Sequence, residues 1–233
     1  MTYIENPICV AIDTPDLERA QELARVLKNH VGMLKVGMEF FYAHGVAGYL
    51  AMAEHGIPMF LDLKLHDIPN TVAAGLNSLL EMEPKPAIVN VHATGGPAML
   101  SAASKAVDGR AKLIAVTILT SLDDDDLAAS GFENSKTTGD HAVNLALLSQ
   151  ANGIDGVVCS PHDLGGIRKA CGRDFLTIVP GIRPQGSASQ DQKRIATPKD
   201  ALAAGADVLV IGRAITGADD PALAAQNILD SLK

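Results

Sequence analysis

Residues 59–67 of the chain read Met59-Phe60-Leu61-Asp62-Leu63-Lys64-Leu65-His66-Asp67. The period-two alternation predicts a β-strand over Met59–Lys64, because successive side chains of a strand point to opposite faces. The leucines of this run then share one face, toward covering helices, while Asp62 and Lys64 share the other. The next helix is expected to begin near Asp67, where a carboxylate would favour the positive helix N-terminus. The run is therefore one strand–helix unit with two charges on the face opposite its leucines.

The same unit recurs along the whole chain. Eight β-rich runs are each followed by a segment of helical periodicity that is rich in Ala and Leu, and the predicted strands are Ile8–Ile12, Met33–Gly37, Met59–Lys64, Ala87–His92, Leu113–Leu119, Gly156–Ser160, Leu176–Val179 and Val208–Ile211. Alternating strands and helices imply parallel pairing and right-handed crossovers. Eight units favour a single (β/α)8 TIM barrel that spans residues 1–233 as one domain. An open doubly wound sheet is the alternative, although the turn at residues 13–16 lacks the glycines of a dinucleotide-binding site.

Hydroxyl–proline pairs and glycines mark the expected helix ends. Helices are predicted to begin at Thr14-Pro15, Ser160-Pro161 and Thr197-Pro198, where a cap precedes a proline whose missing N–H costs nothing. They are predicted to end at glycines that can close a helix in the left-handed conformation, namely Gly32, Gly56, Gly153, Gly172 and Gly205. Two connections, residues 121–138 and 183–196, are unusually long. Both follow the carboxyl ends of strands, so they are expected to be lids or binding loops, or else tolerated surface insertions.

Composition limits the classes of function. The chain has 233 residues, 47% of them hydrophobic, which suffices for one large α/β domain or two small ones. A formal net charge of −8 argues against general attraction to nucleic acid or anionic membranes, so any phosphate needs a local site. No apolar run is long enough to span a bilayer, and no signal peptide is recognisable. Three isolated cysteines fit reduced thiols, and we expect a cytoplasmic protein.

Charged residues stand where a barrel interior is normally apolar. Asp62 and Lys64 are expected to point inward, and Lys35 in the second strand alternates with apolar neighbours and points the same way. Buried charges must be paired or near solvent, and the mouth of the barrel satisfies both conditions. Together with Asp67, these residues would form a series of alternating charges, which keeps the lysines protonated and the carboxylates ionised, so a lysine here would act as a general acid. An internal ion pair that only fixes register is the structural alternative.

Two arginines at neighbouring strand ends predict a phosphate site. Arg213 follows Gly212 after the eighth strand, and Arg183 follows Gly181 after the seventh. Loops after these two strands commonly bind phosphate in barrels, where arginine can contact two oxygens at once and glycine lets the anion approach the backbone. Either arginine alone would more often be a surface residue.

At this point the sequence resembles a known family. The run Phe60–Thr71 resembles the signature of the orotidine 5′-phosphate decarboxylases, most of all the bacterial ones. Five further segments resemble the family in order along the chain, and they are Val10–Asp13, Leu34–Gly37, Val116–Ser121, Pro180–Gly186 and Ile211–Ile215. The resemblance implies conversion of orotidine 5′-phosphate to uridine 5′-phosphate and carbon dioxide. This is the last step in the de novo synthesis of uridine 5′-phosphate, within pyrimidine biosynthesis, and the family implies no cofactor and no metal.

The resemblance also implies a role for individual residues. Lys64 would protonate C6 of the pyrimidine, Asp62 would crowd the substrate carboxylate, and Lys35 and Asp67 would complete the catalytic set. The remaining residues would bind substrate: Asp13 with Lys35 at the ribose, Thr120 and Ser121 at the pyrimidine, and Arg183, Gln192, Gly212 and Arg213 at the phosphate. Asp67 and Thr71 would reach the site of a partner subunit. The family therefore implies a homodimer with shared active sites.

Other interpretations remain open. A magnesium-dependent sugar-phosphate decarboxylase or aldol-type enzyme would need more acidic ligands, for which Glu39 is a candidate, and a non-catalytic barrel could bind a nucleotide as a sensor or scaffold. His66 and His92 are interpreted as packing or supporting residues near the mouth. The run Asp123–Asp126 is interpreted as a solvated loop segment rather than a cation site.

Overall fold

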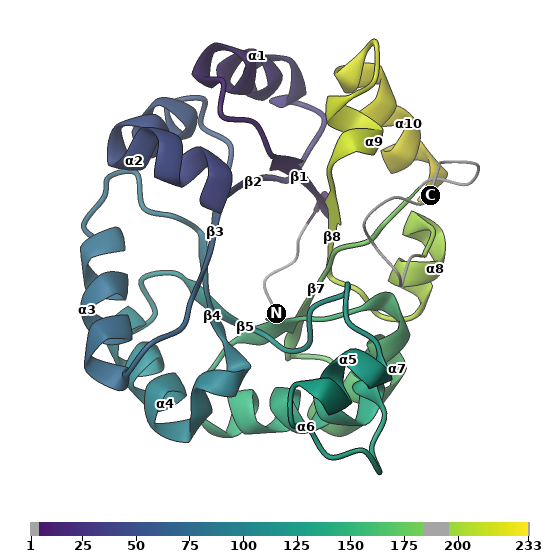
Figure 1. Ribbon diagram of the computed structural model, residues 1–233. Coiled ribbons are helices and arrows are strands. Elements are labelled where there is room, and N and C mark those ends of the chain that lie inside the picture. The colour runs from purple at the N-terminus through teal and green to yellow at the C-terminus, as the bar shows by residue number, and fades with distance from the viewer. Residues whose placement is uncertain (1–4, 184–195, 233) are drawn as a thin grey trace.

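Eight parallel strands form a closed barrel in sequence order, which confirms the TIM barrel and excludes the open sheet (Figure 1). The computed structural model describes residues 5–183 and 196–232. The strands are β1 Ile8–Ile12, β2 Met33–Gly37, β3 Met59–Leu65, β4 Ile88–His92, β5 Lys112–Val116, β6 Gly156–Val158, β7 Leu176–Val179 and β8 Val208–Ile211. β8 pairs with β1 and closes the ring.

Helices surround the barrel on the outside (Figure 1). The α-helices are α1 Leu17–Leu27, α2 Met38–Ala53, α3 Pro69–Leu79, α4 Gly96–Val107, α5 Asp124–Ala129, α6 Thr138–Ala151, α7 Leu164–Cys171, α8 Pro198–Ala203, α9 Arg213–Thr216 and α10 Pro221–Ser231. Two 3-10 turns, η1 Ala93–Gly95 and η2 Pro161–Asp163, follow β4 and β6. Within the described part of the chain, no helix combines the length and the apolar character needed to span a bilayer.

The apolar core has two layers. The larger layer packs the outward side chains of the strands against the helices, and it includes Leu61 with Leu63 and Leu65 at its edge, as the alternation predicts. The smaller layer fills the barrel interior with Cys9, Ala11, Phe60, Ile88, Ile114, Ile178, Val208 and Val210. A filled interior is the normal state of an eight-stranded barrel, so polar chemistry is confined to its rim.

Two strands end earlier than the sequence predicts. β5 ends at Val116 rather than Leu119, and β6 ends at Val158 rather than Ser160. Thr117 donates to the carbonyl of Val158 from both its backbone N, at 3.2 Å, and its hydroxyl, at 2.9 Å, and no residue beyond it extends the described ladder. Ser160 instead caps the 3-10 turn η2. The residues after β5, 118–121, instead line the mouth of the barrel.

The helix-end predictions are partly right. Ser160 and Thr197 are N-caps as expected, but α1 is capped by Asp16 rather than Thr14, and α3 begins at Pro69 rather than at Asp67. Asp67 accepts a hydrogen bond from the backbone N of Ile68, just before that helix.

The glycine predictions hold at four of five positions. The glycines at 56, 153, 172 and 205 all have positive φ at or just after helix ends. Gly32 does not, because α1 ends at Leu27 and Gly32 instead permits a close approach of the chain. A Cβ there would lie 2.0 Å from the carbonyl oxygen of Asn6.

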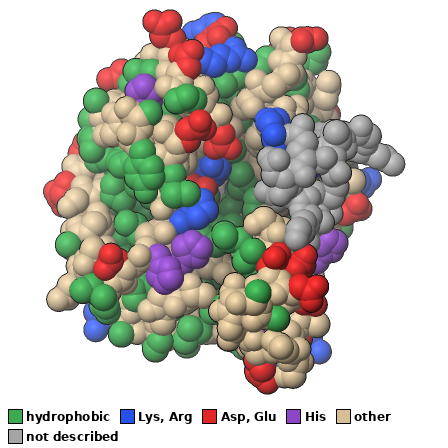
Figure 2. Space-filling view, viewed as in Figure 1, with side chains coloured by type: hydrophobic (Ala, Val, Ile, Leu, Met, Phe, Trp, Pro, Cys, Tyr) green, Lys and Arg blue, Asp and Glu red, His purple; other side chains and the backbone are tan. Residues whose placement is uncertain are grey.

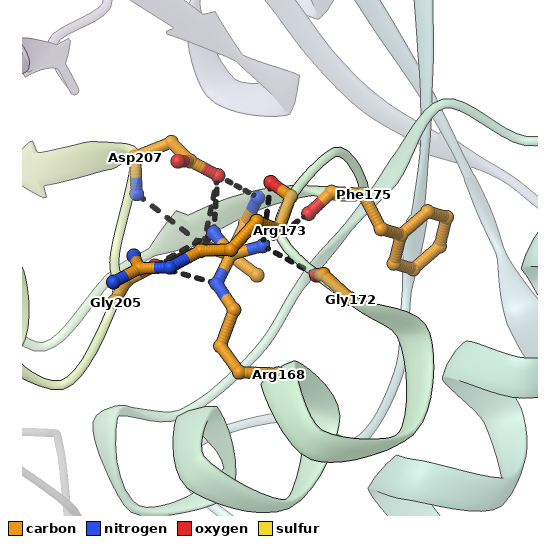
Figure 3. A network of polar contacts seen from close by, with 7 residues as sticks. Arg168, Gly172, Arg173, Phe175, Gly205 and Asp207 are labelled. Carbon is orange, nitrogen blue, oxygen red and sulfur yellow. Dashed lines mark hydrogen bonds and ion pairs between the residues drawn. The ribbon is translucent and has the colours of Figure 1, made fainter.

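Arg168 of α7 joins two loops at the amino-terminal end of the barrel (Figure 3). Its guanidinium donates to the carbonyls of Gly172, Arg173 and Phe175, which precede β7, and to the carbonyl of Gly205 and the carboxylate of Asp207, which precede β8. It also donates to the Thr177 hydroxyl on β7. We call this set the Arg168 cluster, and it lies at the opposite end of the strands from the mouth.

Candidate active site

A cavity of roughly 610 Å³ opens at the carboxyl ends of the strands. Its floor is the upper part of the interior apolar layer, including Phe60, Ile178 and Val210. Nine of the predicted site residues line it together: Asp13, Lys35, Asp62, Lys64, Thr120, Ser121, Arg183, Gly212 and Arg213. Figure 2 shows acidic and basic side chains side by side in this hollow. The sequence therefore identified the polar side chains of the described cavity wall, apart from Thr216.

Four charged side chains form a continuous chain across the mouth. Lys35 Nζ lies 3.2 Å from Asp13 Oδ1 and 3.2 Å from Asp62 Oδ2. Lys64 Nζ donates to Asp62 Oδ1 at 2.7 Å. The order of charges is minus, plus, minus, plus, from Asp13 at the exposed end to Lys64. The alternation predicted from sequence is present, with Asp13 rather than Asp67 as its second carboxylate.

The network sets the ionisation of its buried members. Burial alone would lower the pKa of Lys35, but the carboxylates of Asp62 and Asp13 outweigh it and hold that pKa above its ordinary value. Burial alone would raise the pKa of Asp62, but Lys35, Lys64 and the hydrogen bonds from Lys64 and Asn90 lower it below its ordinary value. Asp62 is therefore a carboxylate and Lys35 an ammonium at neutral pH.

A bulge in β3 brings Asp62 and Lys64 together. Leu61 pairs with Val89 and Leu65 with Val91, so the three residues of β3 between them face one residue of β4, Asn90. Lys64 takes a left-handed backbone with φ 53°, which is uncommon outside glycine and asparagine. Backbone outliers of this kind cluster at functional sites.

The arginines lie with two glycines at the part of the cavity formed by β7 and β8. Gly181 has φ 76°, a conformation that glycine adopts readily. Among the described residues, a Cβ at Gly212 would meet only Ala11, at 3.7 Å, which is ordinary van der Waals contact. Packing against the described residues therefore does not require glycine at 212, which lines the cavity with Arg183 and Arg213.

Two predicted residues that the structure describes are not among those that line the cavity. Asp67 and Thr71 are exposed on the surface around the start of α3. Gln192 lies outside the described residues, as does most of the predicted loop 183–196. The other long loop, 121–138, contains α5. Its acidic run is more ordered than expected, because Asp123 and Asp126 form a reciprocal capping box at the start of that helix.

His66 and His92 lie beside the charged network. Their ring centroids are 5.4 Å apart, which fits the packing role expected from the sequence. Burial, with His66 and Lys64 nearby, lowers the pKa of His92, so its imidazole is neutral at pH 7. Across residues 5–183 and 196–232, no group of three or more His, Cys, Asp or Glu side chains is arranged to hold a metal ion.

Asn90 is the site residue that sequence reasoning missed. It is 1% exposed, and its side chain contacts both Asp62 and the backbone of Lys64. A signal was present in β4, since Ile88-Val89-Asn90-Val91-His92 places an amide at an inward position between two valines. An amide in a barrel interior needs hydrogen-bond partners there.

The fold and the charged cavity define a TIM-barrel enzyme whose chemistry takes place at the carboxyl ends of its strands. The chain belongs to the orotidine 5′-phosphate decarboxylase / HUMPS family, whose model matches residues 6–228. It is 50% identical to the orotidine 5′-phosphate decarboxylase of Erythrobacter litoralis over 225 residues, covering 97% of this chain and 98% of that one. It is 51% identical to the orotidine 5′-phosphate decarboxylase of Sphingopyxis alaskensis over 224 residues, covering 96% and 97%. The crystal structure of the orotidine 5′-phosphate decarboxylase from Lactobacillus acidophilus matches with a TM-score of 0.85 at 35% identity, covering 98% of this chain and 99% of that one.

Proposed function

We propose that the cavity decarboxylates orotidine 5′-phosphate to uridine 5′-phosphate and carbon dioxide, a step of pyrimidine biosynthesis, with Lys64 as the proton donor. The activity follows from the near full-length likeness to enzymes of that name. The observation that carries the assignment of Lys64 is its ion pair with Asp62 inside the cavity. An ammonium group that is held in place by an ion pair with a fixed carboxylate is suited to act as a general acid.

The chemistry requires a group that stabilises negative charge on carbon. When the bond between C6 and the carboxylate breaks, the electron pair stays on C6, where the ring offers no position for delocalisation. The Lys64 ammonium would stabilise this carbanion and transfer a proton to C6, leaving a neutral amine that regains its proton from water. Asp62, held between two lysines, would place a negative charge beside the departing carboxylate.

The rest of the cavity would bind the parts of the substrate that lie away from the breaking bond. Arg183, Gly212 and Arg213 would bind the phosphate, which matches the preference of arginine for phosphate and of barrels for this rim. Asp13 and Lys35 would bind the ribose hydroxyls, and the Thr120–Ser121 pair would contact the pyrimidine. Binding energy gained at the phosphate can then be used to orient the reacting ring.

A homodimer is the second part of the proposal. Large apolar side chains are exposed beside the mouth, among them Tyr42 at 74% on α2 and Ile68 at 67% before α3. Met38 and Val46 on α2 are also exposed, and Figure 2 shows hydrophobic side chains gathered beside the hollow. Apolar patches of this kind mark interaction surfaces. A second copy on this surface would carry its own Asp67 and Thr71 toward the cavity.

The decisive experiment follows the ultraviolet absorbance of orotidine 5′-phosphate with purified protein. The wild type is expected to decarboxylate it with a metal chelator present, and an inactive wild type would overturn the function. A requirement for metal would favour the alternative with Glu39 as a ligand.

The role of Lys64 is tested with a matched pair of variants. Lys64→Ala is expected to lower kcat by about 10²–10⁴-fold, which is the typical contribution of general acid catalysis. Binding of uridine 5′-phosphate should remain, since the phosphate lies elsewhere. Lys105→Ala, a change in the last turn of α4, is the control and should keep full activity. Normal turnover by Lys64→Ala would remove Lys64 from the mechanism.

A further inference from the structure

Asn90 makes two hydrogen bonds inside the barrel with the two ends of its amide. Its Oδ1 accepts from the backbone N of Lys64 at 2.8 Å, and its Nδ2 donates to Asp62 Oδ1 at 2.7 Å. The side chain is 1% exposed, so water does not compete for these groups. Because one bond uses the acceptor and the other a donor, a flipped amide would lose both. The orientation of Asn90 is thereby fixed.

These bonds form a closed ring with the catalytic pair. Lys64 is bound to Asn90 through its backbone and to Asp62 through Nζ, and Asn90 is bound to Asp62. Asp62 Oδ1 accepts both Asn90 Nδ2 and Lys64 Nζ, while Oδ2 faces Lys35 at 3.2 Å. The carboxylate therefore has contacts on both oxygens that set its plane. A ring of this kind leaves little freedom for either the carboxylate or the ammonium.

The backbone of β3 explains why a neighbour must supply this support. On the side of β4, the bulge leaves Asp62, Leu63 and Lys64 opposite Asn90 alone, so this stretch lacks a regular ladder to that strand. Lys64 also takes a left-handed backbone, which is strained for a residue with a side chain. Such a conformation persists only where surrounding contacts hold it. The hydrogen bond from Lys64 N to Asn90 Oδ1 is one such contact, and the strained residue Lys64 makes it directly.

We propose that Asn90 is a positioning residue that fixes Asp62 and Lys64 in their reactive arrangement. This inference rests on the proposed function. Asn90 does not line the cavity, so it acts through its neighbours and not on the substrate. Its loss shifts the proton donor relative to C6 and leaves the phosphate and ribose contacts in place. Turnover falls, and the affinity of the site for the nucleotide is retained.

Two substitutions separate the parts of this role. Asn90→Asp keeps the size of the side chain and an acceptor for Lys64 N, but it replaces the donor with an oxygen facing the carboxylate of Asp62. Asn90→Ala removes both bonds. The matched control is Thr177→Val, which removes a fully buried polar group of the Arg168 cluster at the other end of the barrel. All four proteins are compared by thermal unfolding, by kcat and KM for orotidine 5′-phosphate, and by the inhibition constant of uridine 5′-phosphate.

Both Asn90 variants are expected to lose about 100-fold in kcat, the scale at which a misplacement of about 1 Å affects an enzyme. KM and the inhibition constant should stay within about threefold, because KM reflects binding when chemistry is slow. Thr177→Val should lose thermal stability to a similar degree and keep kcat within about twofold.

Three results would overturn the inference. They are a kcat near that of the wild type in both Asn90 variants, parallel losses of kcat and nucleotide binding, and a comparable loss of kcat in Thr177→Val. If Asn90→Ala does not fold, Asn90→Asp decides the question. Failure of both to fold would assign Asn90 to structure alone. An inactive wild type would instead overturn the proposed function, so the two failures are distinguishable.

Discussion

Gly37 shows how closely the backbone approaches the charged network at the scale of one residue. A Cβ placed on Gly37 would lie 3.2 Å from Lys35 Nζ and 3.7 Å from Asp13 Oδ1. Lys35 is already in contact with two carboxylates, so it cannot move without weakening one of them. Glycine at this position leaves the ammonium in its place.

Gly37→Ala is therefore expected to lower kcat/KM roughly tenfold, since small displacements at a reacting centre are costly. Steady-state kinetics on orotidine 5′-phosphate would measure the change. Gly165→Ala in α7 is the control, because a Cβ there meets nothing within 4 Å. Equal kinetics for the two variants would show that Lys35 tolerates the shift.

The ionisation of Asp62 predicts a pH dependence of stability. A carboxyl group whose pKa is lowered in the folded state stabilises the protein above its unfolded pKa of about 3.9, and this contribution is lost as pH falls through the folded value. Lys35 has a raised pKa, so its contribution is present below about pH 10.4 and is lost as pH rises through the folded value. Neither group should titrate in the neutral range.

Urea unfolding of wild type and Asp62→Asn at several pH values would test this. The difference between their free energies of unfolding should be constant from about pH 5 to pH 9. Below about pH 4 the wild type should lose stability relative to Asp62→Asn, which has no carboxyl at 62 to protonate. A change in the difference near pH 7 would mean that Asp62 is not ionised there.

At the scale of single elements, β3 shows what a sequence pattern predicts and what it does not. Alternation correctly assigned the leucines to the helix side and Asp62 and Lys64 to the interior. It could not reveal the bulge, because a bulge depends on pairing with β4, and the partner of Lys64 N is 26 residues away. The inward amide of Asn90 was visible in the pattern of β4, but its contact with Lys64 N could not be predicted, for the same reason.

The ends of β5 illustrate a second limit of sequence patterns. Ile118 and Leu119 are typical strand residues, yet they line the cavity beyond the last ladder contacts of Thr117. Local preference cannot separate an apolar strand residue from an apolar wall residue. The prediction that Gly32 ends a helix was wrong for a similar reason, because the role of this glycine depends on Asn6, which is distant in the sequence.

The Arg168 cluster leads to a prediction about α7 and the two strands that follow it. One guanidinium holds the loops before β7 and β8 together through carbonyls and Asp207 (Figure 3). Arg168→Ala leaves several of these acceptors without a donor, and we expect a loss of about 3 kcal/mol in the free energy of unfolding. Arg168→Lys keeps the charge and loses the planar fork, so it should recover only part of the loss.

Urea unfolding would measure both Arg168 variants, with kcat recorded at a temperature where each is folded. Turnover should be unchanged, because the cluster lies at the end of the barrel away from the cavity. A stability within about 0.5 kcal/mol of the wild type for Arg168→Ala would contradict the prediction.

At the scale of the whole molecule, shared sites predict complementation between inactive variants. If Asp67 serves the partner's cavity, a mixed dimer of Lys64→Ala and Asp67→Ala contains one site with both residues intact. Random exchange of equal amounts makes half of the dimers mixed, so about a quarter of wild-type activity should return. Activity is measured before and after exchange by unfolding and refolding together.

The control mixes Lys64→Ala with Asp62→Ala. These two residues contact each other within one chain, so every mixed dimer would have a defect in each site and no activity should return. Recovery in the control, or none in the test mixture once exchange is verified by mass, would count against sharing across subunits.

The bulge in β3 also limits how this chemistry could be moved to another protein. Three consecutive residues share one partner in β4, so the lysine and the carboxylate depend on a backbone path that an idealised barrel lacks. A designer who copied only the two charged side chains onto a regular strand would leave out the left-handed residue and the amide that binds it. The smallest portable unit is the strand pair β3–β4, with its irregular spacing and Asn90 included.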